Sequence, residues 1–123
     1  MKRLFTVLSL TGLFLFLSSY KISAQVNEQD SLALVDLYIS TDGPNWTNNT
    51  NWLTGSVDSW YGVTVDAGNV TKVLLNNNNL TDSVGLGPMS NLRVLYLNDN
   101  NISRLSSGLS LVQPLDSLRI DNT

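Results

Sequence analysis

The stretch that decides the fold is VTKVLLNNNNL, residues 70–80. Its spacing of apolar residues returns 22 residues later in LRVLYLNDNNI, residues 92–102, and begins a third time in LDSLRI, residues 115–120. In every copy the first, fourth and sixth positions are apolar, and both complete copies carry asparagine at the ninth. A pattern that recurs at a nearly constant period predicts one structural unit for each copy.

Within each copy, apolar and polar residues alternate in the way that a strand with one buried face requires. The alternating apolar pairs are Val73/Leu75, Leu95/Leu97 and Leu118/Ile120. We therefore expect three short strands that stack in parallel, one for each copy. Asn78 and Asn100 should occupy equivalent inner corners, where an amide can bond backbone groups that burial would leave unsatisfied. A disordered polar tract is the alternative for the asparagine run at 76–79, but the shared phase of Asn78 and Asn100 disfavours it.

These copies resemble the leucine-rich repeat, whose consensus is L-x-x-L-x-L-x-x-N-x-L. The resemblance implies an α/β fold, a leucine-rich repeat solenoid with a short parallel sheet wound into a right-handed coil. Residues 70–123 would hold two complete repeats and a truncated third, as the N-terminal part of a longer solenoid or as a truncated product. Glycine and proline in the connecting segments, 81–91 and 103–114, argue against long helices, so short 3₁₀ or irregular turns are expected there.

Residues 25–69 do not follow the repeat and are expected to cap its first open end. Asp30 or Ser31 can serve as the N-cap of a helix that stops in the turn at 40–44. The apolar residues of this helix share one face, which predicts packing against the rest of the domain. They are Ala33, Leu34, Leu37 and Tyr38.

After the helix, residues 60–65 read as a strand, and residues 66–69 turn the chain back into the first repeat strand. The whole stretch resembles the N-terminal cap of extracellular leucine-rich repeat proteins, and bacterial secreted versions look closest. The matching residues are Ala33, Leu34, Leu37, Tyr38, Asn45, Trp46, Asn51, Trp52, Leu53, Trp60, Gly62, Val63, Thr64, Val70 and Thr71. Plant relatives of this cap often carry a disulfide. Here Val65 stands after Thr64 in place of a cysteine, so apolar packing is expected instead.

Three tryptophans lie in the predicted cap: Trp46, Trp52 and Trp60. Their expected role is to fill the core of the cap, because each indole buries a large apolar area. The alternative is that exposed indoles stack on sugar rings, which would make the cap a carbohydrate-binding or adhesion module.

The first 24 residues have the layout of a secretory signal peptide. A positive start at residues 1–3 precedes an apolar run at 4–17 and a polar stretch that ends in Ala24. The apolar run is shorter than the about 20 residues that a membrane span needs. The sequence therefore predicts export to the cell surface or medium, cleavage after Ala24 and a mature chain that begins at Gln25, with no stable membrane insertion. The alternative is an N-terminal anchor that is cleaved poorly.

Residues 25–123 carry four basic and ten acidic residues, a formal charge of −6, which disfavours a nucleic-acid partner. The chain has no histidine and no cysteine, so histidine triads, thiol nucleophiles and zinc sites built on these residues are excluded. Hydrolysis by a carboxylate pair stays open on composition alone, without a supporting spacing. We therefore expect a protein that is not an enzyme and uses no cofactor.

The residues between the buried strand positions should face outward and form three short rows. We predict that a partner protein binds there, at Lys72, Leu74, Asn76, Val94, Tyr96, Asn98, Ser117, Arg119 and Asp121. The middle row consists of Leu74, Tyr96 and Arg119. Tyrosine and arginine are enriched at binding hot spots. The alternative is that Leu74 and Tyr96 only support each other across adjacent strands. A Ca²⁺ site made from Asp99 and Asp121 beside Asn76 and Asn98 lacks a recognisable motif, so no metal is expected.

Overall fold

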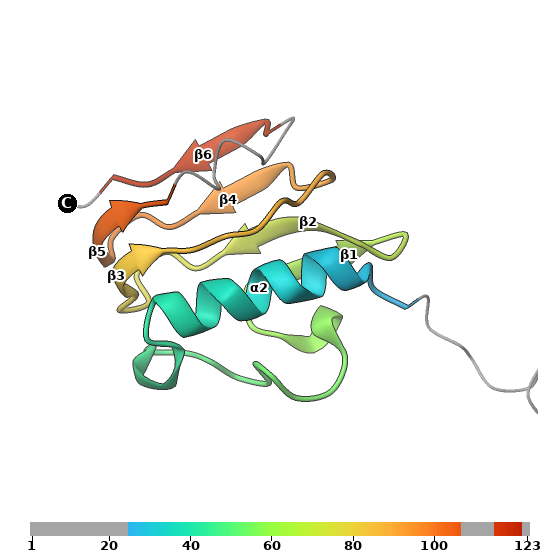
Figure 1. Cartoon of the computed structure of the whole chain (residues 1–123), viewed down its shortest axis with the longest axis horizontal. Helices are drawn as coiled ribbons and strands as arrows, with labels where there is room; N and C mark the ends of the chain where they lie inside the picture. Colours follow the sequence, from blue (N-terminus) through green and yellow to red (C-terminus); the bar gives the residue numbers. More distant parts are fainter. Residues whose placement is uncertain (1–24, 107–114, 122–123) are drawn as a thin grey trace, which may run out of the picture.

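The computed structural model describes residues 25–106 and 115–121, so the predicted signal peptide lies outside the described residues. The described chain folds as a small mixed α/β unit (Figure 1). Its elements are α2 (Glu28–Ser40), two 3₁₀ turns (Gly43–Asn45 and Val57–Ser59), and strands β1 (Val63–Asp66), β2 (Asn69–Leu74), β3 (Thr81–Val84), β4 (Val94–Tyr96), β5 (Asn101–Leu105) and β6 (Ser117–Arg119).

The strands form two sheets in the described part of the chain. The main sheet has the order β1-β2-β4-β6, and the second sheet pairs β3 with β5. In the main sheet β2, β4 and β6 run parallel, whereas β1 pairs with β2 in the antiparallel direction. Val73, Leu95 and Leu118 are register partners, so the three sequence copies are aligned strand by strand. The predicted strand at the start of each copy is therefore confirmed.

The predicted leucine-rich repeat solenoid is wrong. The described residues form one helix and two sheets, one mixed and one parallel, in place of a single parallel sheet wound into a right-handed coil. The antiparallel pairing of β1 with β2 makes the main sheet mixed. The turn at 66–69 that reverses the chain was predicted as part of the cap, and it is confirmed.

The reason for the difference from the predicted solenoid lies in the connecting segments, where residues 81–84 and 101–105 form strands β3 and β5. Residues 85–91 are irregular, as predicted, and residues 107–114 lie outside the described part of the chain. The backbones along β3 and β5 bond to each other, with Asn101 N donating to Leu80 O at 2.8 Å and Ser106 N donating to Val84 O at 3.0 Å.

The helix α2 begins earlier than the sequence predicted. Asn27 is its N-cap, and the Asn27 side chain accepts a hydrogen bond from Gln29 N at 2.9 Å. The expected cap at Asp30 or Ser31 is therefore wrong. The predicted end is confirmed, because α2 stops at Ser40 before the 3₁₀ turn.

The core is one cluster that joins the inner face of the main sheet to α2 and to the tryptophans of the 41–62 loop. Its members Val73 and Leu95 are fully buried, while Leu118 on the edge strand β6 is 45% exposed. The core therefore thins from β2 toward β6. The three tryptophans are all buried. Trp52 contacts both of the others, with ring centroids 4.8 Å from Trp46 and 5.0 Å from Trp60.

Each indole N–H of this cluster donates to a backbone carbonyl: Trp46 to Thr41, Trp52 to Tyr61 and Trp60 to Thr54. The predicted core role of the tryptophans is confirmed. The predicted strand at 60–65 is shifted, because Trp60 closes the second 3₁₀ turn and β1 begins at Val63.

Asn78 and Asn100 are both buried at the ends of the first two copies. The Asn100 Oδ1 accepts hydrogen bonds from the backbone N–H groups of Asn78 and Leu80, at 2.9 and 3.0 Å. Its Nδ2 donates to the carbonyls of Leu75 and Leu97, both at 2.9 Å. The predicted role of these asparagines, to satisfy buried backbone groups where the chain leaves its strand, is confirmed.

Candidate partner-binding face

The nine residues that the sequence singled out lie on neighbouring segments: six on β2, β4 and β6, and three in the stretches that directly follow these strands. We call the surface that they form the outer face: Lys72, Leu74, Asn76, Val94, Tyr96, Asn98, Ser117, Arg119 and Asp121. The strand register aligns Lys72 with Val94 and Ser117, and Leu74 with Tyr96 and Arg119. Two predicted rows are therefore side by side across β2, β4 and β6.

The third row lies beyond the ends of the strands, in the segments that follow Leu74, Tyr96 and Arg119. These segments still run next to one another. Asn77 N donates to Asn98 O at 2.9 Å, and Asp99 N donates to Asp121 O at 3.0 Å. The structure thus brings all three rows together on neighbouring chain segments.

Tyr96 is the best-anchored side chain of the outer face. The guanidinium carbon of Arg119 lies 4.9 Å from the centroid of the Tyr96 ring, a cation–π contact. The Ser117 hydroxyl donates to the Tyr96 hydroxyl at 3.4 Å. Tyr96 and Leu74 are half-buried, whereas Arg119 is exposed. A contact of this kind at an exposed site contributes about 0.5–1 kcal/mol, enough to orient the ring without anchoring the fold.

Sequence reasoning missed two charged residues at the start of the strands. The Arg93 guanidinium lies 3.8 Å from the Asp116 carboxylate, and both side chains are about half exposed or more. Such a surface pair contributes at most about 1 kcal/mol. Arg93 also lines a hollow together with Lys72 and Asp66. Strict alternation from Leu95 and Leu97 assigns position 93 to the inward side, so the pattern did not single out Arg93.

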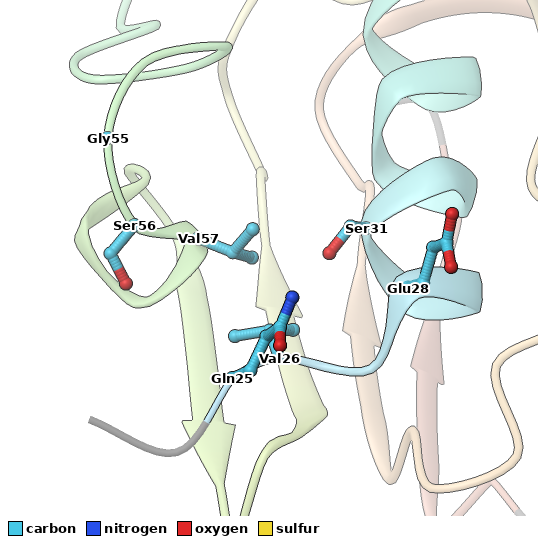
Figure 2. A pocket seen from close by; sticks show the side chains of 7 residues that line it. All are labelled: Gln25, Val26, Glu28, Ser31, Gly55, Ser56 and Val57. Atoms are coloured by element: carbon cyan, nitrogen blue, oxygen red, sulfur yellow. The ribbon is translucent and has the colours of Figure 1, made fainter. Parts of the chain in front are cut away.

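A second hollow lies at the start of α2 (Figure 2). It is bounded by Gln25 and Val26, by the first turns of α2, and by the loop around Val57. Val57 and Ser31 point toward one another across it (Figure 2). Of its seven described lining residues, only Glu28 carries an ionisable side chain. A lone carboxylate beside hydroxyl and amide groups offers hydrogen bonds but no paired acid and base.

The carbohydrate-binding alternative requires exposed indole rings that can stack on sugars. In the described cap all three tryptophans are buried, so none offers such a ring. Within residues 25–106 and 115–121, no group of three or more acidic residues is placed to hold a metal ion. No helix in the same ranges is long and apolar enough to cross a bilayer.

Comparisons with protein-family models, with curated proteins and with solved structures found no match to this chain.

Proposed function

We propose that this chain is an exported, non-enzymatic interaction module that binds a partner protein through its outer face. The observation that carries the proposal is the middle row of that face. There the register places Tyr96 between half-buried Leu74 and Arg119, and the Arg119 guanidinium lies over the Tyr96 ring. Tyrosine and arginine provide much of the binding energy at protein interfaces. The resemblance to secreted leucine-rich repeat proteins stays a prediction and favours the same class of function.

The size of the outer face limits the kind of partner. Three strands spaced about 4.8 Å apart give a surface about 10 Å wide. A standard stable interface takes about 800 Å² from each protein. The outer face by itself therefore suits a transient contact or one extended segment of a larger partner.

Site-specific photo-crosslinking in cells that produce the chain tests the proposal. A photoreactive amino acid replaces Leu74 in the full chain, and a second variant carries it at Asp58, an exposed residue of the second 3₁₀ turn that is outside the outer face. We expect one discrete crosslinked protein from position 74 and none from position 58. Tyr96→Ala and Arg119→Ala should each abolish that crosslink.

Matched substitutions test whether the loss of any exposed tyrosine or arginine side chain would weaken the crosslink. Tyr61→Ala and Arg104→Ala remove the same side-chain types from exposed positions outside the outer face, and they should leave the crosslink intact. Equal loss in the control variants, or equal crosslinking from position 58, would contradict the proposal. A glycan array provides the opposing test, because sugar binding that survives Tyr96→Ala would point to another class of ligand.

A further inference from the structure

The charges of this chain are divided unevenly along its length. Residues 25–71 contain six acidic residues and no lysine or arginine, and all four basic residues of the segment 25–123 come later. Two of the six, Glu28 and Asp36, are exposed on α2, whereas Asp30 on the same helix is buried. The surface of α2 is therefore acidic without a compensating base on the helix.

The same helix exposes two large apolar side chains. Ile39 is 70% exposed and Leu32 is 58% exposed, the highest values among the large apolar residues of the described chain. They are seven residues apart, which places them on one side of the helix, about 10 Å from each other. Asp36 lies between them on this side. A helix packed against a core normally buries such residues, so this pair is unpartnered.

A groove runs beside these side chains, between α2 and the segment 85–88. One hollow extends from Glu28 and Leu32 to Asp36 and Gly87, and a second extends from Asp36 and Gly87 to Ile39. The two hollows adjoin at Asp36 and Gly87, and together we call them the groove along the helix.

The wall of the groove is held close to α2. The Ser40 hydroxyl accepts a hydrogen bond from Gly85 N at 2.8 Å. A Cβ atom at Gly85 would lie 3.3 Å from the Ser40 side chain, and one at Gly87 would lie 3.4 Å from the Ala33 Cβ. The two glycines therefore let the backbone approach the helix directly, which fixes the shape of the groove.

We propose that this groove docks a basic amphipathic segment of a partner protein. Two apolar side chains of the segment would cover Leu32 and Ile39, and lysine or arginine side chains would pair with Glu28 and Asp36. Charge complementarity selects this occupant. In a symmetric dimer of this chain, the same acids would face each other across the interface with no base on either helix, and like charges at an interface are costly. The negative charge of residues 25–123 also attracts a basic partner at long range.

Titration of the full chain with a model peptide tests the docking site by NMR. The probe is an amphipathic peptide made only of leucine and lysine at helical spacing, and its control has glutamate in place of every lysine. We expect the lysine peptide to shift backbone amides of α2 and of residues 85–88, and the glutamate peptide to shift none. The double variant Leu32→Ser, Ile39→Ser should weaken binding about tenfold or more. Glu28→Gln with Asp36→Asn should weaken it and reduce its dependence on salt.

Leu53→Ser is the matched control, because Leu53 is also an exposed leucine but lies outside the groove. It should leave the affinity unchanged. The proposal is overturned if the lysine peptide does not bind, if the Leu32/Ile39 double variant binds it equally well, or if both peptides bind alike. A concentration-dependent dimer that the same double variant abolishes would also overturn it, since the groove would then serve a second copy. Outer-face variants such as Tyr96→Ala should have no effect, so this test stands apart from the proposed function.

Discussion

The carboxylate of Asp30 accepts a hydrogen bond from the backbone N–H of Val70 at 2.9 Å, which ties α2 to the first parallel strand across 40 residues of sequence. Asp30 is only 1% exposed, and Val70 is fully buried. A buried backbone N–H without an acceptor costs free energy, so this side chain satisfies the Val70 N–H near the start of β2.

Asp30→Ala should therefore destabilise the protein by about 1–3 kcal/mol, because it leaves the Val70 N–H buried without an acceptor. Chemical denaturation measures the change in the free energy of unfolding. Asp36→Ala removes the same side chain from an exposed position of the same helix and should change stability by less than about 0.5 kcal/mol. Equal losses in the two variants would contradict the role of Asp30.

Asn100→Ala should destabilise the protein by about 3 kcal/mol or more. The substitution removes an acceptor for two backbone N–H groups and a donor to two carbonyls, all buried. The neighbouring Asn101 is exposed, so Asn101→Ala should stay within about 0.5 kcal/mol of the parent. Thermal and chemical unfolding measure the stability of the two variants. Equal stability of Asn100→Ala and Asn101→Ala would contradict the prediction and would show that water replaces the amide.

Tyr96→Ala and Arg119→Ala should weaken partner binding and leave the thermal midpoint nearly unchanged. Their cation–π contact contributes only about 0.5–1 kcal/mol to the fold. Trp52→Ala provides the contrast, because loss of a buried indole costs about 3–5 kcal/mol. Calorimetry distinguishes the two classes. A large drop in midpoint for the outer-face variants would make those residues structural, and the binding surface would have to lie elsewhere.

Backbone amides should exchange with solvent more slowly in β2 than in β6. β2 is bonded on both sides, to β1 and to β4, whereas β6 is an edge strand with Leu118 45% exposed. Edge strands with few buried contacts open at lower free energy than central ones. Hydrogen exchange on a monomeric sample, followed by mass spectrometry or NMR, measures the exchange rates. Equal protection of β2 and β6 would refute the predicted decrease in local stability from β2 to β6.

The exported protein should begin at Gln25. The layout of residues 1–24 is that of a signal peptide, which is removed during secretion. N-terminal sequencing of protein recovered from the medium or the cell surface checks this cleavage. Recovery of chains that begin at Met1 would favour an uncleaved anchor.

The sequence by itself determined two kinds of feature. One depends on the alternation of apolar and polar residues within a strand, and the other on equivalent positions in the copies, which are about 22 residues apart. A two-residue alternation predicts a strand and its buried face, and the 22-residue offset predicts which residues are neighbours. For this reason the sequence predicted the alignment of Val73 with Leu95, the burial of Asn78 and Asn100, and the alignment of Leu74 with Tyr96 and Arg119.

The tertiary structure alone decided the second sheet and the exposed side of α2. Gly85, Gly87 and Pro88 favoured turns in the segment 81–91, whereas β3 and β5 depend on backbone pairing with a segment about 20 residues away. Asp30 looked like a helix cap because its partner, the Val70 N–H, is distant in sequence. The exposure of Leu32 and Ile39 likewise depends on which face of α2 meets the core. Contacts between segments far apart in the chain settle such features, since local propensity gives way to packing and to the need to pair every buried polar group.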